Sequence, residues 1–488
     1  MNLARRFDGH RPSAPALVVG GVSLTYAELE ERVARWRGGL AAAGVGPDDR
    51  VAVVSGNDLT FVLAHLAVVG CGATSVPLNP RTTSVELTRE LAAAEVTAAV
   101  VGPDGRVAWS GVAAAERPPE LAAERLDGGD PAPVIDVADD DPAVLLFTSG
   151  TAGWPRPAVL THGNLEASIR SLLSLDIDLV GADHVLLTVI PLFHVFGLNT
   201  VLHLGLAVGA CVVAEDFTTT GRVAELVEVN GVTVVVGPPN LWWALARDES
   251  LGAGPFATVL LAVSGAAKLL PEVAEAVAGR FGLAVVEGYG LTETCATVAA
   301  AAGVDAPVGS VGPPMPGVEV RLVDGDGHDV LVGDPGELLV RGPMVSPGYR
   351  RAGGGIDPLL TLDGWLATGD VAVVDEHGHL SIVDRSKDIV IVAGFNVYPA
   401  EIEAVLATHP AVADVGVVGE PDEATGERLV AHVVPSGGAD PDVGELLAHC
   451  EASLARYKVP KRIELTASLP VGAVGKLRRR ELRRPDGA

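Results

Sequence analysis

Hydroxyl-bearing residues and glycines gather in one short segment, Thr148–Pro157, directly after the apolar run Val144–Phe147, which predicts a buried strand. A loop of this composition allows several backbone N–H groups and hydroxyls to converge on one phosphate group. A cation a few residues later, at Arg156, would neutralise part of the phosphate charge. The segment therefore predicts a phosphate-binding loop formed by Thr148, Ser149, Gly150, Thr151 and Arg156.

Five later segments accompany this loop in chain order: Pro191–Gly197, Glu287–Thr294, Asp363–Asp370, Asp384–Asp388 with Ala393–Glu403, and Leu469–Arg478. Together they resemble the motifs of the adenylate-forming enzymes, the superfamily of acyl-CoA synthetases, luciferases and peptide-synthetase adenylation domains. The resemblance covers nearly the whole chain and is strongest to the acyl-CoA ligase branch. The phosphate loop is atypical for that family, which usually reads TSGTTGxPKG, because this chain has Ala152, Arg156 and Pro157 there.

The resemblance implies an acid–thiol ligase that uses ATP, Mg²⁺ and coenzyme A. Transfer of AMP from ATP to a carboxylic acid gives an acyl-adenylate and pyrophosphate, and a thiol then attacks the adenylate. Because the first step brings a carboxylate against a polyphosphate, cations must offset the repulsion. The resemblance assigns this work to Lys476, the α-phosphate to Thr292, Mg²⁺ to Glu293 and a gate beside the acyl carboxylate to His194. Outside the family context, Thr292 and Glu293 are equally suited to cap a helix, and His194 to a core.

Further residues are expected to bind the nucleotide and coenzyme A if the resemblance holds. The implied adenine slot consists of Gly265, Ala266, Gly288 and Tyr289. Asp370 would accept the ribose hydroxyls, with Arg385 as its partner. Lys387 falls at the implied hinge of a swinging carboxyl-terminal domain. The pantetheine tunnel would be bordered by Ala393, Gly394 and Phe395.

The altered loop leaves three catalytic functions open, and a non-catalytic protein that only binds nucleotide is the last alternative, because the features on the coenzyme A side remain. Arginine and lysine are not interchangeable at a phosphate site, and Pro157 removes a backbone donor. Losing one charge-assisted bond costs about 1.5–3 kcal/mol, or one to two powers of ten in affinity. The chain is therefore either a complete acyl-CoA ligase for a hydrophobic acid or a variant that accepts an acyl-adenylate from a separate adenylating enzyme. An adenylation domain that loads a carrier protein is less favoured, since Val232–Trp243 is apolar and has no acidic residue for a substrate ammonium.

The elements that must position these residues follow from the hydrophobic pattern. Thr25–Glu28 forms a capping box before an amphipathic helix, and helices then alternate with Val-rich strands to about Val286, which predicts helix-covered parallel sheets. From Val308 to Val383, Gly, Pro and Asp punctuate short strands, as in an antiparallel β subdomain. We expect an α/β fold with an acyl- and AMP-binding domain over residues 1–384 and a small mobile α+β domain over 385–488. The segment Gly102–Asp141 reads as a surface excursion.

Composition excludes several other classes of function. The formal net charge of −27 argues against nucleic-acid binding, and no apolar run approaches the length of a membrane span. Four scattered cysteines and the absence of a signal-peptide pattern favour a cytoplasmic location. Basic residues nevertheless crowd the chain from Arg456 to Arg484, either as a solvated helix face or as a positive wall for coenzyme A.

Overall fold

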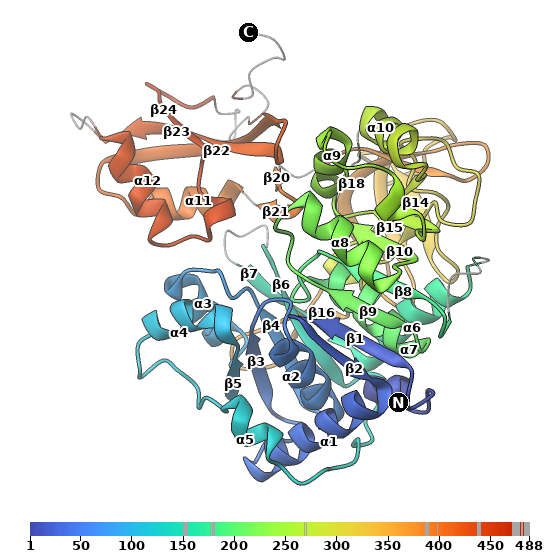
Figure 1. The fold of residues 1–488 in the computed structure, drawn as a ribbon. Coiled ribbons are helices and arrows are strands. Elements are labelled where there is room, and N and C mark those ends of the chain that lie inside the picture. Colours follow the sequence, from blue (N-terminus) through green and yellow to red (C-terminus); the bar gives the residue numbers. More distant parts are fainter. Residues whose placement is uncertain are drawn as a thin grey trace.

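Two large sheets form the centre of the chain in the computed structural model (Figure 1). The structure describes residues 1–149, 155–175, 177, 181–267, 269, 271–385, 390–397, 399–436, 441–470, 479 and 482. The first sheet has eight strands in the order β13-β12-β11-β10-β8-β9-β1-β2, parallel throughout except for the outer strands β13 and β2. Its strands are β1 Pro15–Val19, β2 Val22–Thr25, β8 Val185–Thr188, β9 Cys211–Ala214, β10 Val234–Gly237, β11 Leu261–Ser264, β12 Val285–Tyr289 and β13 Ala299–Ala300.

The second sheet has seven strands in the order β17-β16-β7-β6-β4-β3-β5. Its strands are β3 Arg50–Val54, β4 Thr74–Leu78, β5 Ala98–Val101, β6 Pro142–Ser149, β7 Pro155–Thr161, β16 Gly348–Arg350 and β17 Ile356–Pro358. Strands β5, β3, β4 and β6 are parallel, whereas β7, β16 and β17 add on in antiparallel fashion. The strands β6 and β7, which flank the predicted phosphate loop, are antiparallel, so the strand direction changes between them.

Two smaller sheets follow in the chain. The antiparallel sheet β14-β15-β18-β19 contains Glu319–Val323, Gly336–Arg341, Leu366–Val374 and Leu380–Arg385. The last sheet contains β20 Val390–Val392, β21 Phe395–Val397, β22 Val412–Asp422, β23 Gly426–Pro435 and β24 Arg462–Leu465, and α11 Pro399–Leu406 and α12 Val443–Glu451 pack on it around a separate apolar core. This confirms the predicted fold class of a large α/β part, a β subdomain and a small α+β part.

Helices cover both large sheets, as the alternating sequence pattern predicts. The helices are α1 Tyr26–Ala42, α2 Leu59–Gly70, α3 Ser84–Ala93, α4 Arg106–Gly111, α5 Ala123–Asp127, α6 His162–Leu173, α7 Leu204–Ala207, α8 Thr220–Asn230, α9 Pro239–Arg247 and α10 Pro271–Phe281. The predicted capping box begins α1, with Thr25 and Glu28 bonded reciprocally. In the described part of the chain, no helix is long and apolar enough to cross a membrane.

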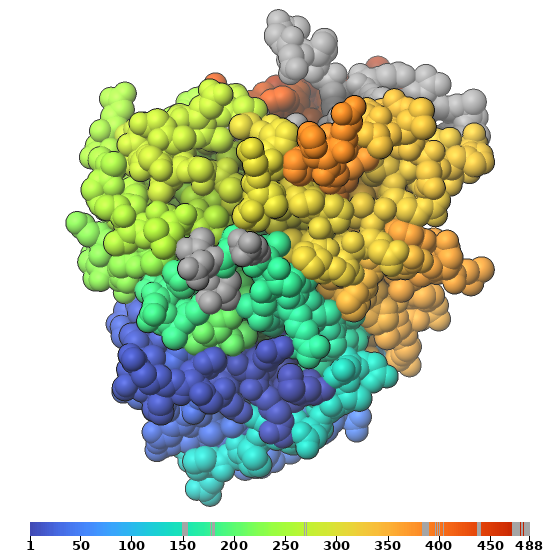
Figure 2. All heavy atoms as spheres, turned by 90° about the vertical axis from the view of Figure 1, so that its right-hand side faces the viewer, coloured from blue at the N-terminus to red at the C-terminus, as the bar shows by residue number. Residues whose placement is uncertain are grey.

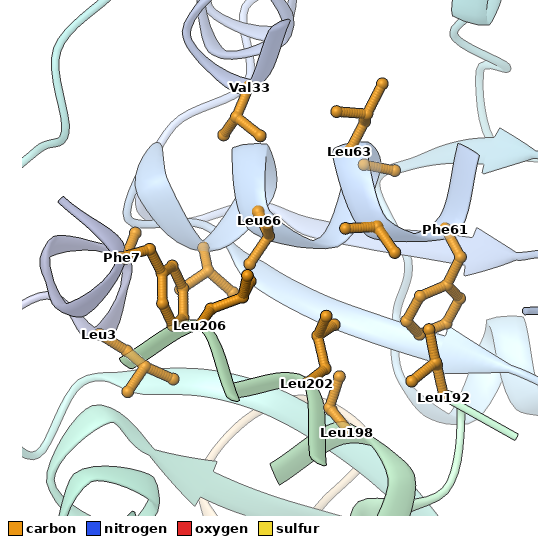
Figure 3. Close-up of a cluster of buried hydrophobic side chains, with 14 of the residues drawn as sticks. Leu3, Phe7, Val33, Phe61, Leu63, Leu66, Leu192, Leu198, Leu202 and Leu206 are labelled. Carbon is orange, nitrogen blue, oxygen red and sulfur yellow. The ribbon is translucent and has the colours of Figure 1, made fainter. Parts of the chain in front are cut away.

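The largest apolar core lies between α2 and the π-helix η3 (Phe196–His203). In Figure 3, Phe61 and Leu66 of α2 face Leu192, Leu198 and Leu202. Ten consecutive residues of α2, Phe61–Gly70, are buried, so this helix lies inside the molecule. The packing fixes η3 in place, and η3 supplies one wall of the candidate site described below.

The segment Gly102–Asp141 lies on the surface, as expected, and most of its residues are exposed. It forms α4 and α5, and Trp109 and Leu126 are among the buried residues of two cores. Its many alanines and prolines surround a few large apolar anchors, and these place the segment against the sheets.

Figure 2 shows another face of the molecule, on which the yellow and orange residues of the β subdomain lie beside the green residues of the eight-stranded sheet region.

Candidate active site

An apolar cavity of about 130 Å³ lies where β10, β11 and β12 meet the π-helix η3. Val234 and Val236 of β10 and Phe196 of η3 line it, together with aliphatic side chains from the end of α6. Among the described residues, no carboxylate and no lysine or arginine lines this cavity. Such a lining excludes water and favours a hydrophobic acyl or aryl group.

His194 lies at the junction of this cavity with a second cavity of about 200 Å³. The second cavity brings Pro238 and Asn240 of the β10–α9 region together with Ala393, Gly394 and Phe395. Burial lowers the pKa of His194 to about 4, so the imidazole is neutral near pH 7. A neutral ring between two cavities can separate or connect them without introducing a charge.

The residues expected to form the adenine slot lie together at the rim of the first cavity, which Gly265, Ala266, Gly288 and Tyr289 all line. A Cβ atom on Gly265 would lie 2.7 Å from the Phe196 ring, so only glycine permits this close approach. The Tyr289 hydroxyl donates to Asp370 Oδ2 over 2.6 Å, and Asp370 is 2% exposed. Asp370 faces Arg385 in the β18–β19 register, as the predicted partnership requires of the backbone.

The phosphate-loop residues divide into described and undescribed ones. Thr148 and Ser149 end β6, whereas Gly150 and Thr151 lie outside the described residues. The Thr148 hydroxyl is buried and has no hydrogen-bond partner among the described groups, which is the state expected of a group that awaits a phosphate oxygen. Arg156 lies opposite Thr148 at the start of β7, where its guanidinium pairs with Asp357.

Thr292 and Glu293 begin η5 (Thr292–Thr294), directly beside the apolar cavity. Glu293 Oε1 accepts a hydrogen bond from the Tyr349 hydroxyl over 2.5 Å, and the Glu293 carbonyl accepts one from the Ser346 amide over 2.7 Å. The alternative helix-capping role falls instead to Thr294, whose hydroxyl accepts from the Leu291 amide. One oriented carboxylate beside a phosphate site suits Mg²⁺, which takes few protein ligands and completes its shell with phosphate oxygens and water.

Backbone strain concentrates at the same place. Of the five non-glycine residues with positive φ in the described chain, Ala266, Cys295, Ala296 and Ala393 lie at or next to the two cavities. Left-handed conformations of such residues cost about 1–3 kcal/mol each and persist where the surroundings enforce them, commonly at functional sites. The strain therefore supports the assignment of this region as the working part of the molecule.

The carboxyl-terminal segment reaches the site through Ala393, Gly394 and Phe395. A Cβ atom on Gly394 would lie 3.1 Å from Cβ of Pro238, so the two parts of the chain touch there. The Phe395 ring stacks on Tyr457 at 4.2 Å between centroids. The expected catalytic Lys476 and the expected hinge residue Lys387 lie outside the described residues.

Two of the basic residues expected to form a positive wall for coenzyme A, Lys458 and Arg462, are paired with carboxylates instead. Lys458 is buried, and its ammonium contacts Glu86 at 3.1 Å and Glu401 at 2.9 Å. Arg462 pairs with Glu420, so the charge of this arginine is likewise balanced by a carboxylate of the protein. These cations stabilise internal contacts because carboxylates far away in the sequence reach them.

Several residues at the site were not predicted from the sequence. Tyr349 and Asp357 contact Arg156, Thr200 lines the apolar cavity and Asn240 lines the second one. The Thr200 hydroxyl and the Asn240 side-chain oxygen are buried without a partner among the described residues. Only Thr200 had a local signal, because it follows the predicted His194 by six positions in the chain.

Comparison with known proteins gives the same family over nearly the full length. The family description "AMP-binding enzyme" matches residues 4–350, and "AMP-binding enzyme C-terminal domain" matches residues 401–476. The chain is 38% identical to a feruloyl-CoA synthase of an Amycolatopsis species, over 98% of this chain and 96% of the relative. It is 35% identical to a long-chain-fatty-acid–CoA ligase of Yersinia pestis, over 96% of this chain and 91% of the relative.

The comparison with solved structures points to the same family. A double mutant of o-succinylbenzoate CoA synthetase from Bacillus subtilis, bound with its product analogue, superposes with a TM-score of 0.88 at 28% identity and covers 99% of this chain and 98% of that one. The shared fold, the motif order and the site geometry agree with one another. The chain belongs to the AMP-binding, adenylate-forming enzyme family, in its acid–thiol ligase (acyl-CoA synthetase) branch.

Proposed function

We propose that this protein is a complete acyl-CoA synthetase that joins a hydrophobic carboxylic acid to coenzyme A through an acyl-adenylate. The observation that carries this proposal is the junction of an apolar cavity with a second cavity at His194 and Ala266. The first cavity suits the acyl group, and the second, which ends at Gly394, suits a pantetheine arm. A non-catalytic protein that only bound nucleotide would not need the second cavity.

In the first step, a carboxylate oxygen of the acid attacks the α-phosphorus of ATP, and pyrophosphate leaves. Thr148 and Thr292 are placed to bind phosphate oxygens, and Asp370 to accept the ribose hydroxyls. Mg²⁺, when bound at Glu293, would neutralise phosphate charge. Lys476 is proposed to supply a further cation at the reacting carboxylate. Because the apolar cavity excludes water, these charges act more strongly on the transition state.

In the second step, the thiol sulfur of coenzyme A attacks the acyl carbonyl carbon, and AMP leaves. We propose that the neutral His194 lies beside this carbon, because His194 lines both cavities. The unpartnered Asn240 oxygen is available to an amide N–H of the pantetheine arm. We propose that residues 385–488 swing about Lys387 between the two steps.

The acyl group is proposed to be largely apolar, with one polar substituent away from the carboxylate. The Thr200 hydroxyl lines the apolar cavity and is buried without a partner among the described residues. Thr200 lies six positions after His194, and both residues line this cavity. A hydroxyl or ether on the acyl group away from its carboxylate could bond to the Thr200 hydroxyl. The relative named for feruloyl-CoA is consistent with this class of acid.

The test is a product assay with a panel of acids in the presence of ATP, Mg²⁺ and coenzyme A. We expect acyl-CoA, AMP and pyrophosphate in equal amounts for medium-length apolar acids, with the highest kcat/KM for those that carry a distal hydroxyl or methoxy group. A phosphopantetheinylated carrier protein is offered as a rival acceptor in parallel. Faster acyl transfer to the carrier than to coenzyme A would contradict the proposal.

A second candidate function rests on one observation at the phosphate loop. The Arg156 guanidinium, in the position of the family's lysine, is paired with Asp357 and stacked on Tyr349. A cation engaged in this way contributes less to pyrophosphate binding than a free one. The rival function is a ligase that takes a preformed acyl-adenylate from a separate adenylating enzyme and carries out the thioester step alone.

A further inference from the structure

Two side chains of the β16–β17 hairpin engage Arg156. Its guanidinium carbon lies 4.1 Å from the centroid of the Tyr349 ring, and its terminal nitrogen pairs with Asp357. Tyr349 and Asp357 are direct partners across the hairpin, and Tyr349 also pairs with Ala158 of β7. Because Arg156 and Ala158 are two residues apart on one strand, all of these side chains lie on the same face of the sheet.

Asp357 is an anchor for this arrangement. Arg351 contacts it at 3.1 Å, and the two arginines, Arg351 and Arg156, hold the pKa of the Asp357 carboxyl below its usual range. The carboxylate is therefore charged at neutral pH. It fixes the guanidinium over the tyrosine ring, and the side chain of Arg156 is one-third exposed (33%), so the stack is only partly screened by water.

Tyr349 connects Arg156 to Glu293. Its hydroxyl donates to Glu293 Oε1 over 2.5 Å, while its ring carries the guanidinium. The Ser346 amide holds the Glu293 carbonyl from the same chain segment. Three residues from β7, β16 and η5 thus form one continuous chain of contacts from the atypical loop position to the expected metal carboxylate.

We propose that Arg156 acts as a positioning residue, which orients the Glu293 carboxylate for Mg²⁺ through Tyr349, rather than as a ligand of the phosphates. This inference rests on the proposed function in so far as Glu293 is taken as the metal carboxylate. A planar guanidinium can stack on a ring and pair with a carboxylate at once, whereas the compact ammonium of lysine cannot do both. The exchange of lysine for arginine is then a change of role and not a loss.

The test measures metal binding without turnover. Mn²⁺ is titrated by electron paramagnetic resonance into the full chain with α,β-methylene-ATP, whose bridging carbon prevents AMP transfer. Arg156→Lys and Tyr349→Phe are each expected to weaken Mn²⁺ binding by about threefold to thirtyfold. The double variant is expected to bind no more weakly than the weaker single one, because both changes break one chain of contacts. Arg351→Lys is the matched control, since Arg351 also pairs with Asp357 and lysine keeps its charge. This variant is expected to bind Mn²⁺ within twofold of the unchanged protein.

Two results would overturn the inference. The first is an Arg156→Lys variant whose Mn²⁺ affinity stays within twofold while its affinity for the nucleotide falls. That result is expected if Arg156 binds the phosphates directly. The other is an unchanged protein that binds no Mn²⁺ with the analogue. Failure of the proposed function is a separate result, since it shows as absent acid-dependent pyrophosphate exchange while Mn²⁺ and the analogue still bind.

Discussion

At the scale of single residues, we propose that the Thr200 hydroxyl, which has no partner among the described residues, contributes to the choice of acid. A buried hydroxyl without a partner costs about 1–3 kcal/mol, and a substrate group that bonds to it recovers part of this cost. Thr200 lies in an otherwise apolar lining, so its influence on selectivity should be seen against few competing polar contacts.

We predict that Thr200→Val lowers the preference for a hydroxylated acid over its unsubstituted analogue by about tenfold in kcat/KM, because valine keeps the shape and removes the hydrogen bond. Steady-state kinetics with the matched pair of acids measures this preference. Thr297→Val is the control, since the Thr297 hydroxyl lines the same cavity but is already bonded to Ser168 over 2.9 Å. An unchanged preference in the Thr200 variant would remove this residue from substrate recognition.

The sequence could identify residues that lie inside a motif and could not identify their distant partners. Tyr289 and Asp370 were predicted one motif at a time, and the structure joins them by a hydrogen bond. Asp357 is 201 residues from Arg156, and no local pattern marks it as a partner. The arginine was therefore interpreted as an altered phosphate ligand, because the hairpin that engages it is visible only in three dimensions.

At the scale of elements, a buried hydrogen-bond chain connects α2 to the helix that lines the acyl cavity. His65 of α2 bonds to His203 of η3 between their Nε2 atoms at 2.8 Å. His203 Nδ1 donates to Asn199 Oδ1, so its Nε2 accepts from His65, whose Nδ1 in turn accepts from Ser75. Every member is neutral and satisfied, and the chain fixes η3 in one register.

The buried histidines of the protein predict how its stability depends on pH. Burial lowers the pKa of four histidines, to about 3 for His65, to about 4 for His162 and His194, and well below the usual value for His203. Below pH 6.5 the unfolded chain binds protons at these rings and the folded chain does not, so the free energy of unfolding falls as the pH is lowered. Glu90 and Glu401, whose pKa values burial raises, act in the opposite direction over the same window.

We therefore predict a net loss of about 1–3 kcal/mol per pH unit between pH 6.5 and 5. Urea unfolding at three pH values in this window measures it. A free energy of unfolding that rises or stays flat as the pH falls would contradict the neutral-histidine description of η3.

Helices and strands were predicted well where apolar residues recur periodically. They were predicted poorly where a few isolated apolar residues hold a segment in place. The capping box predicted at Thr25–Glu28 begins α1, and the predicted alternation of helices and strands forms the two large sheets. The surface position of Gly102–Asp141 was predicted, but its buried anchors Trp109 and Leu126 were not, because they are isolated among small and polar residues. The π-helical form of η3 had no signal in the sequence.

At the scale of the whole molecule, the carboxyl-terminal part is held against the rest by buried charges. Lys458 bonds to Glu86 of α3 and to Glu401 of α11, and burial raises the pKa of the nearby Glu90 to about 8. In this pose Gly394 touches Pro238 at the second cavity. The ionic contact therefore stabilises the arrangement in which the proposed thiol tunnel is formed.

We predict that Lys458→Met slows thioester formation from synthetic acyl-adenylate and coenzyme A by at least about tenfold, because removal of one partner from a buried ion pair costs several kcal/mol. Acid-dependent pyrophosphate exchange should fall by a smaller factor, since it belongs to the other pose. Lys461→Met is the control at an exposed neighbouring lysine. Equal losses in both half-reactions would show that Lys458 serves general stability and not this pose.

The central claim is that the enzyme makes its own acyl-adenylate despite the atypical loop. Acid-dependent exchange of labelled pyrophosphate into ATP, measured without coenzyme A, tests it most directly. The account predicts exchange at a rate at least equal to overall acyl-CoA formation by the same preparation. Absence of exchange, with acyl-CoA still formed from synthetic acyl-adenylate and coenzyme A, would contradict it.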